Sequence, residues 1–530
     1  MTGPNAVSEA GSSPTQSDHT PGAHPAEAGP LAGAQAAPES ATVAETPEPV
    51  QGEYLGESES NGEGNSCHPN PTHYTDAAGN RVAFGSAEAA EQERETRRRD
   101  RGHVFHSWSA QNKINPMPIA HAEGAWIFDY AGNAYLDLAS QLVSANLGHA
   151  HPDLVAALQR QATRVTNLNP AFANDLRGQV AETITDRAQG DFSHVFFTNG
   201  GADAIEHAIR LARLHTGKSK ILTAYRSYHG ATGSAIMATG EPRRHGNPTT
   251  DGDIKHFWGP FLYRTPFHAT TEEEECERAL SHLEQTLIFE GDVAAVLVES
   301  MVGSSGVIAP PDGYLAGVRD ICDRHGAVWI ADEVMVGFGR TGRMFAYEHG
   351  GCARDGGVLQ PDLVTFAKGV NSGVVPFGGV MMTQAVADTF GDRPYPGGLT
   401  YSGHPLGAAV AVAAQEVYQR DHIFDHVADI GSRVIGPALA EIAAKHPSVG
   451  NVRGRGFFWA IELVADHDSK EPLGAEAMKQ FASECKAGGV WPMVSGSRTH
   501  IAPPLITTEA EVRQALEVVD SAIDATDRAL

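Results

Sequence analysis

The stretch Ala-Val-Trp-Ile-Ala-Asp-Glu-Val at residues 327–334 decides the fold class of this chain. Its first five residues form a short, continuous apolar run, which is typical of a strand that is covered on both faces of a sheet. Three runs of the same kind precede it, at residues 195–197, 221–224 and 294–298.

The segments between these runs have the pattern of amphipathic helices. One of them ends at Gly326 after a helical stretch over residues 314–324. Another carries four apolar residues on one helical face and a glycine stop: Ile205, Ala208, Ile209, Ala212 and then Gly217. Repeated strand–helix–strand units predict an α/β fold with a mostly parallel sheet and helices on both faces.

Polar residues follow these strands at the edge where parallel sheets bind ligands. Asp332 closes the run over 327–331, and Lys368 ends the next strand along the chain. A lysine amine can form a Schiff base with the aldehyde of pyridoxal phosphate (PLP), and a carboxylate can keep the pyridine nitrogen of that cofactor protonated. Because strand side chains alternate, Val334 shares the face of Asp332 and Glu333 does not. The alternative is that Asp332 caps a turn and Glu333 is solvated.

Two more motifs follow strands of the same sheet. Gly201 and Ala202, in Thr-Asn-Gly-Gly-Ala-Asp at 198–203, open a helix whose backbone N–H groups can approach a phosphate. Tyr228 and His229 follow the run over 221–224, where an aromatic ring can cover one face of a planar cofactor. Taken alone, the first motif is also compatible with an ordinary glycine turn and the second with core packing or a surface loop.

Together and in this order, the motifs resemble the class III (omega-type) PLP-dependent aminotransferases. The similarity runs from about Val104 to the C-terminus. It rests on Asn-Leu-Gly-His at 146–149, Asn-Gly-Gly-Ala at 199–202, Tyr-His-Gly at 228–230, Asp-Glu-Val at 332–334, Gly-Phe-Gly-Arg-Thr-Gly at 337–342, Phe-Ala-Lys-Gly at 366–369, Thr-Tyr-Ser-Gly-His-Pro at 400–405, Val-Arg-Gly-Arg-Gly at 452–456 and Ala-Pro-Pro-Leu at 502–505.

The resemblance implies the fold type I architecture, with a large PLP-binding domain, a smaller α+β domain made from both chain ends, and a homodimer or dimer of dimers with active sites at the interface. It divides the chain at residues 101–165, 166–405 and 406–530. It also implies that Lys368 anchors PLP and shuttles protons, that Thr400 reaches the phosphate of the neighbouring subunit's cofactor, and that six further residues bind the cofactor: Gly201, Ala202, Tyr228, His229, Asp332 and Val334.

The implied reaction is ping-pong transamination from an omega-amino acid or amine to pyruvate or 2-oxoglutarate. Many relatives pair an Arg before the Ala-Pro-Pro motif with a Glu, but His500 and Ser304 stand at those positions here. Arg498 is therefore the candidate replacement for binding an acid group, since a guanidinium holds carboxylate or sulfonate as a fork; a solvated rim arginine is the alternative.

The branch that these phrases resemble most is that of taurine and related omega-amino-acid transaminases. Taurine is favoured over β-alanine and 4-aminobutyrate as the donor. Trp108 could line the substrate pocket, although packing is an alternative. Decarboxylation, racemisation or amine migration on the same PLP core, or a non-catalytic scaffold, remain alternative functions. The donor, the acceptor and the choice between dimer and tetramer stay open.

Composition separates an N-terminal extension from the rest of the chain. Residues 1–100 are predicted to be a disordered acidic extension that ends in a charged helical stretch over 87–101, because few large apolar residues occur there. We expect activity to survive deletion of about 85 residues. Cys67, His68 and His73 could ligate a metal, but no second ligand pair follows, so no metal site is predicted.

The 530 residues carry a net charge of −26, which disfavours nucleic acid and acidic membranes as partners. The five scattered cysteines do not form a disulfide pattern, and there is neither a secretory signal nor an apolar run long enough to span a bilayer. These features predict a cytoplasmic enzyme whose partners are small molecules.

Overall fold

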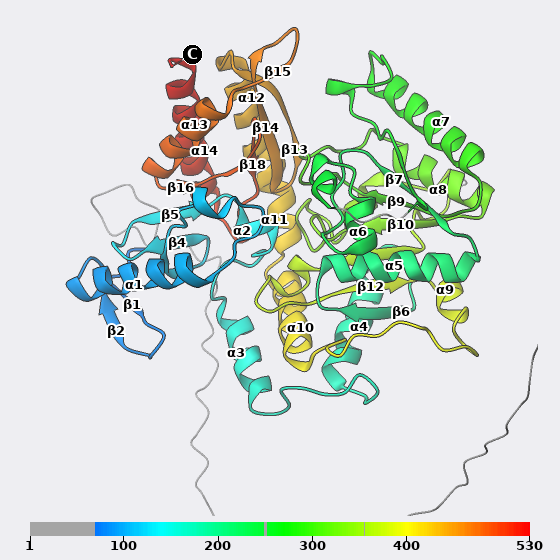
Figure 1. Ribbon diagram of the computed structural model, residues 1–530, viewed down its shortest axis with the longest axis horizontal. Helices are drawn as coiled ribbons and strands as arrows, with labels where there is room; N and C mark the ends of the chain where they lie inside the picture. Colours follow the sequence, from blue (N-terminus) through cyan, green and yellow to red (C-terminus); the bar gives the residue numbers. More distant parts are fainter. Residues whose placement is uncertain (1–68, 248–251, 355, 530) are drawn as a thin grey trace, which may run out of the picture. The chain divides into compact units, whose positions relative to one another are not determined.

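A seven-stranded sheet forms the centre of the computed structural model, which describes residues 69–247, 252–354 and 356–529 (Figure 1). Its strands run in the order β6 (His194–Thr198), β12 (Gly378–Met382), β11 (Leu363–Phe366), β10 (Val328–Asp332), β9 (Val293–Glu299), β7 (Lys220–Ala224) and β8 (Ile254–Phe257). β12 alone runs opposite to the other six strands of this sheet. The predicted α/β class and mostly parallel sheet are confirmed.

Both faces of this sheet are covered by helices. Alternate residues of β10 belong to different clusters: Val328 and Ile330 pack with α5 (Gly201–Thr216), whereas Trp329 packs with α8 (Tyr314–His325). Every residue of β10 is buried, as expected for a strand between two helical layers. The helices end at Gly217 and Gly326, both in the left-handed conformation that glycine adopts without strain.

A four-stranded sheet joins the two ends of the chain. β16 (Val490–Trp491) pairs in parallel with β5 (Ala134–Asp137), so that Val490 lies opposite Leu136, and Figure 1 shows the two strands side by side. The remaining strands of this sheet are β4 (Trp126–Asp129) and β3 (Ile119–Glu123). A five-stranded sheet contains β13 (Val449–Arg455), β14 (Phe458–Asp466), β15 (Glu471–Pro472), β17 (Met493–Ser495) and β18 (Arg498–Ile501).

The other helices connect or cover these sheets. They are α2 (Ser140–Val143), α3 (Pro152–Ala162), α4 (Asp175–Arg187), α6 (Gly233–Ala238), α7 (Glu272–Glu290), α9 (Gln384–Asp388), α10 (Pro405–Arg420), α11 (Ile423–Ile430), α12 (Gly436–Lys445), α13 (Ala475–Ala487) and α14 (Glu509–Asp527). Short helical turns at η2 (Pro242–Gly246), η4 (Ala346–Gly350) and η5 (Lys368–Asn371) lie close to the residues discussed below. No helix among the described residues is long and apolar enough to cross a membrane.

Arg340 connects the central sheet to both chain ends. Its guanidinium is fully buried and donates hydrogen bonds to the backbone oxygens of Phe457 and Pro503, to Ser140 Oγ at 3.2 Å and to Asn146 Oδ1 at 3.0 Å. Burial lowers the pKa of Arg340 to about 9. A buried guanidinium is tolerated only when several acceptors surround it. Because its acceptors belong to residues 140–146 and 457–503, Arg340 holds the segment after β10 against both of these parts of the chain.

The predicted disorder ahead of the helical stretch is wrong for residues 73–83. Two short strands, β1 (His73–Thr75) and β2 (Arg81–Ala83), form a hairpin before α1 (Ala87–His103). Tyr74 is 4% exposed, Val82 1% and Ala89 0%, in a small cluster with Tyr130. The prediction used the average composition of a hundred residues, to which these few apolar side chains contribute little. They pack against a later part of the chain. The helical stretch is confirmed as α1, whereas residues 1–68, including Cys67 and His68, lie outside the described residues.

Deletion of residues 1–85 is expected to lower the free energy of unfolding by about 2–4 kcal/mol, because Tyr74 and Val82 bury apolar surface against α1 and Tyr130. Thermal melting of the truncated and full-length proteins measures the effect. Deletion of residues 1–68 is the control, since it removes none of the described contacts. Equal melting temperatures for all three proteins would contradict this packing role.

Candidate active site

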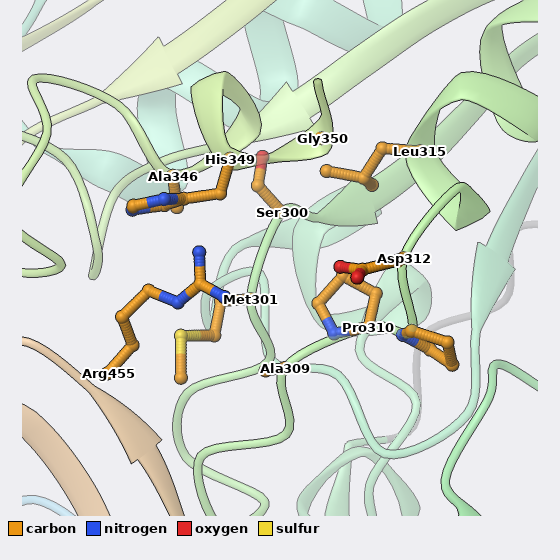
Figure 2. Close-up of a pocket in the computed structure, with 11 residues that line it drawn as sticks. Ser300, Met301, Ala309, Pro310, Asp312, Leu315, Ala346, His349, Gly350 and Arg455 are labelled. Carbon is orange, nitrogen blue, oxygen red and sulfur yellow. The ribbon is translucent and has the colours of Figure 1, made fainter. Parts of the chain in front are cut away.

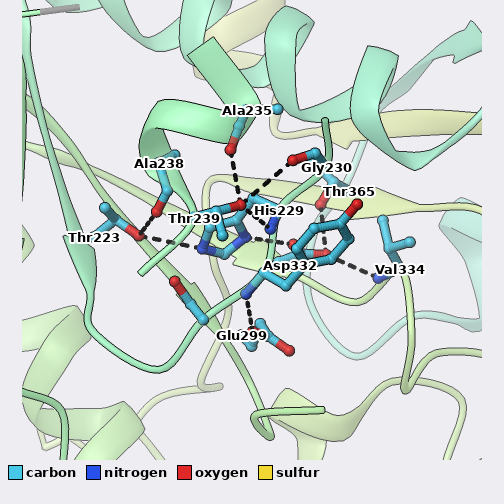
Figure 3. A network of polar contacts seen from close by, with 12 residues as sticks. Thr223, His229, Gly230, Ala235, Ala238, Thr239, Glu299, Asp332, Val334 and Thr365 are labelled. Carbon is cyan, nitrogen blue, oxygen red and sulfur yellow. Dashed lines mark hydrogen bonds and ion pairs between the residues drawn. The ribbon is translucent and has the colours of Figure 1, made fainter. Parts of the chain in front are cut away.

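Strand register brings three polar residues together at the carboxyl end of the central sheet. Asp332, the last residue of β10, lies opposite Glu299 on β9 and opposite Thr365 on β11. Thr365 donates a hydrogen bond from Oγ1 to Asp332 Oδ1 at 3.3 Å, as Figure 3 shows. Parallel strands in register therefore place these side chains in one row, although they are distant in the sequence.

Asp332 is held on both carboxylate oxygens. Oδ2 lies 2.6 Å from His229 Nδ1, and Oδ1 accepts a hydrogen bond from the backbone N–H of Val334 at 3.0 Å (Figure 3). The His229 ring is fixed on its other side by Thr223, whose Oγ1 lies 3.2 Å from Nε2. Asp332 is only 4% exposed, so these contacts set the direction of a buried charge.

Glu333 points away from this site. Its carboxylate is fully buried and accepts hydrogen bonds from the backbone N–H groups of Ala346 and Tyr347 at 2.8 and 2.9 Å. Burial raises the pKa of Glu333 to about 8. The two acidic neighbours thus have different surroundings, as alternation along the strand predicts, but Glu333 anchors η4 instead of being solvated.

Lys368 follows β11 and stands at the start of η5. Its backbone has φ = 49°, a left-handed conformation that is uncommon outside glycine. Its amine makes no hydrogen bond or ion pair with any described residue. Burial lowers the pKa of Lys368 to about 8, while Asp332 and Glu299 act in the opposite direction. An amine with this pKa is readily deprotonated near neutral pH and can act as a nucleophile or a base.

Glu299 is a site residue that the sequence analysis missed. Its carboxylate accepts hydrogen bonds from the backbone N–H groups of Tyr228 at 2.9 Å and Gly303 at 2.7 Å. Burial raises the pKa of Glu299 to about 7, and Asp332 adds to the effect. The available signal was its position, because it closes a buried apolar run just as Asp332 does.

The predicted phosphate-binding residues open helix α5 beside Val334. A Cβ added to Gly201 would lie 2.6 Å from Val334 Cγ1, and one added to Gly230 would lie 2.6 Å from the Cβ of Ala202. Only glycine permits these close approaches. The N-cap residue Gly200 has no side chain to satisfy the first N–H groups of the helix. This small, donor-rich cradle fits a phosphate group.

The remaining predicted site residues lie further out. Trp108 is 63% exposed, and Thr400 is exposed between α9 and α10. Arg498 on β18 is half-buried beside Gly306, and its guanidinium has no hydrogen bond or ion pair among the described residues. His500, two residues further on, is buried with its Nε2 3.4 Å from the backbone oxygen of Gly303.

A small cavity behind the sheet end is separate from this site. It has a volume of about 40 Å³ and is lined by residues that include Ser300, Ala346, His349 and Arg455 (Figure 2). Ser300 follows Glu299 in the chain, next to the side on which Glu333 is buried. A space of this size suits water and not an amino acid substrate. Lys368, Asp332 and Tyr228 are not among its lining residues.

Comparison with known proteins agrees with this geometry. The family model described as aminotransferase class-III matches residues 108–523. A taurine–pyruvate aminotransferase of Rhodobacter capsulatus is 31% identical over 453 residues, covering 80% of this chain and 95% of the relative. The 4-aminobutyrate aminotransferase of Escherichia coli is 31% identical over 421 residues, covering 78% and 94%.

A solved structure is also similar. The taurine:2-oxoglutarate aminotransferase of Bifidobacterium kashiwanohense, in complex with PLP and glutamate, is 36% identical with a TM-score of 0.78. The match covers 83% of this chain and 99% of that protein.

Replacement of Lys368 with methionine is expected to stabilise the cofactor-free protein below pH 8 by about 3 kcal/mol, because the buried ammonium is removed. The pKa of this lysine is about 8 when folded and 10.5 as a free side chain, so the unfolded state binds more protons between these values. Wild-type stability should therefore rise from pH 8 to about 10.5 and approach that of the variant. Denaturant unfolding between pH 7 and about 10.5 measures the free energy of unfolding of both proteins. A difference between the two free energies that does not change with pH would contradict the burial of the lysine charge.

Proposed function

Because the chain belongs to the class III aminotransferase family and is a PLP-dependent enzyme, we propose that it moves the amino group of a terminal amine with an acid group to a keto acid. Taurine, β-alanine and 4-aminobutyrate are the candidate donors, with pyruvate and 2-oxoglutarate as acceptors. The observation that carries this proposal is the lysine amine with lowered pKa beside a buried, fully hydrogen-bonded aspartate.

The described residues suit PLP. When bound, this cofactor supplies an aldehyde and an electron-accepting ring. Asp332 would hold a proton on the pyridine nitrogen, and His229 and Thr365 keep its carboxylate in place for this. Tyr228 and Val334 would cover the ring, while the open amide groups at Gly201 and Ala202 would bind the phosphate. Lys368 would anchor the cofactor.

In this proposal, Lys368 is the residue that transfers the proton. Once released by the donor amine, Lys368 takes a proton from the substrate carbon and returns one during each half-reaction. In the cofactor-free protein, burial lowers the pKa of this lysine to about 8, which favours loss of the ammonium proton and so suits a base. Glu299 would fix the backbone of Tyr228 and thus the position of that ring.

Assembly and location are part of the same proposal. Thr400 is exposed in the single chain and would reach the phosphate across the interface of a homodimer or dimer of dimers. The division into a small domain from 101–165 and 406–530 and a large domain from 166–405 is supported by the pairing of β16 with β5. We place the enzyme in the cytoplasm.

Arg498 would bind the acid group of the substrate. The neighbouring Glu462 is already paired with Arg453 at 2.8 Å and with Arg264 at 2.6 Å. Arg498 is left without a partner among the described residues, and its Nε atom is buried. An unpaired, half-buried guanidinium is unfavourable unless an anion arrives to pair with it.

The first test follows the visible absorbance of the purified holoenzyme while taurine, β-alanine and 4-aminobutyrate are added in turn. A true donor should convert the visible band of the cofactor, and pyruvate or 2-oxoglutarate should restore it. Lys368→Ala should not complete the cycle. Loss of the band without restoration by any keto acid would overturn transamination and favour another PLP reaction.

Substitution of Arg498 by glutamine should raise KM for β-alanine at least about tenfold, equivalent to about 1.4 kcal/mol of binding. KM for propylamine, which has a methyl group in place of the acid, should not change. Arg513→Gln is the control, since Arg513 pairs with Glu509 on the exposed side of α14. Equal effects on both amines would contradict the role of Arg498.

A further inference from the structure

Arg243 stands directly over the ring of Tyr228. Its guanidinium carbon is 3.9 Å from the centre of the Tyr228 ring and 5.8 Å from that of Trp108. Both contacts are cation–π interactions, which hold the planar group without using its N–H donors. Arg243 thus joins the exposed Trp108 to the ring of Tyr228, whose backbone N–H donates to Glu299.

Glu241 pairs with this arginine from the same loop. One oxygen of its carboxylate accepts from Arg243 Nε, and the other accepts from Ser305 Oγ at 3.3 Å. The side chain of Glu241 is 13% exposed, and that of Arg243 is 36% exposed. The two terminal amino groups of Arg243 have no hydrogen bond among the described residues, so they are available to a second anion.

Arg498 reaches the same loop from β18. It lies beside Gly306, where an added Cβ would be 3.0 Å from its Nε, and the carboxylates of Glu462 and Glu241 are both close enough to act on its charge. Ser305, which donates to Glu241, is the neighbour of Gly306. Glu241 therefore pairs with Arg243 and lies within electrostatic range of Arg498, whose guanidinium has no hydrogen bond or ion pair among the described residues.

The arginines behind Arg498 do not change this balance of charges. Arg453 donates to the backbone oxygen of Gly306 at 2.6 Å, to Asn451 and to Glu462, so each of its three nitrogens already has an acceptor. Arg264 shares Glu462. These groups are positive overall and strengthen the attraction for an anion. Of the four arginines, Arg498 has no acceptor on any nitrogen and Arg243 has none on its two terminal nitrogens among the described residues.

We propose that Arg243 and Arg498 bind the carboxylate or sulfonate of the substrate together, and that Glu241 is the counter-ion that the substrate displaces. This inference rests on the proposed function and adds to it the residues that select acidic over neutral amines. Glu241 competes with the substrate for the same guanidinium groups. Removing its charge should therefore tighten the binding of acids, whereas loss of a merely structural carboxylate would weaken it.

In this proposal, the pair Arg243–Glu241 also leaves the site intact when the substrate has no acid group. When no acid group is present, Glu241 keeps Arg243 paired and the second oxygen stays on Ser305. An acid group entering over Tyr228 gains the free N–H groups of Arg243 and those of Arg498. Since the acid replaces one anion by another, the expected gain in affinity is modest, about fivefold at a partly exposed site.

The experiment compares Glu241→Gln, Arg243→Gln and wild-type holoenzymes with β-alanine, taurine and propylamine. Glu241→Gln should lower KM for both acids about twofold to fivefold, and Arg243→Gln should raise it by about fivefold or more. Neither should change KM for propylamine by more than about twofold. Arg244→Gln is the matched control, because Arg244 stacks on Tyr225, 5.5 Å away, and not on Tyr228.

Calorimetry measures the affinity of the same holoenzymes for propionate and ethanesulfonate, which lack an amino group and cannot turn over. Comparing the two affinities shows whether the site prefers a carboxylate or a sulfonate. Tighter binding of at least one acid by Glu241→Gln and weaker binding by Arg243→Gln support the exchange. Weaker binding of both acids by Glu241→Gln, or equal changes for acids and propylamine, overturns it. Absence of keto-acid consumption with every amine would refute the proposed function, and the calorimetry would still decide the role of the pair.

Discussion

The register of the parallel strands β9, β10 and β11 is the constraint on which the site depends. It sets Glu299, Asp332 and Thr365 in one row where the strands end. A shift by one residue would turn Asp332 towards the opposite helical layer and bring Glu333 into its place. The alternating apolar contacts of β10 with α5 and α8 prevent such a shift, because both faces of the strand are buried.

Burial then gives each charged group of the row its chemical character. The lysine loses part of its preference for the charged form, so its pKa falls to about 8, whereas the pKa of Glu299 rises to about 7. Asp332 is surrounded by partners for both of its oxygens. Burying these ionisable groups lowers the free energy of unfolding, and such a cost is typical of functional sites.

In this proposal, the residues around this fixed centre that meet the substrate come from separate parts of the chain. Arg243 belongs to η2 after α6, Arg498 to the C-terminal sheet and Trp108 to the segment after α1. Arg340 keeps the segment after β10 in contact with residues 140–146 and 457–503, so these distant parts meet in one place. Substrate choice in this proposal is therefore decided at the rim, while the chemistry is decided at the strand ends.

The sequence by itself determined the strand–helix order, the strands over 195–197, 221–224, 294–298 and 327–331, and the class III family. These are local patterns of apolar period and of motifs that lie within a few residues of one another. It also indicated that Asp332 and Glu333 face apart, which needs only the alternation of a strand.

Tertiary structure alone decided which residues meet across long separations. Glu299 became a partner of Tyr228, and Glu241 came to pair with Arg243 within electrostatic range of Arg498, because strand register and loop packing set those distances. Tyr74 and Val82 were predicted to be disordered from composition, yet they are buried against Tyr130. Contacts of this kind depend on what a distant segment offers, and no local pattern in the sequence records it.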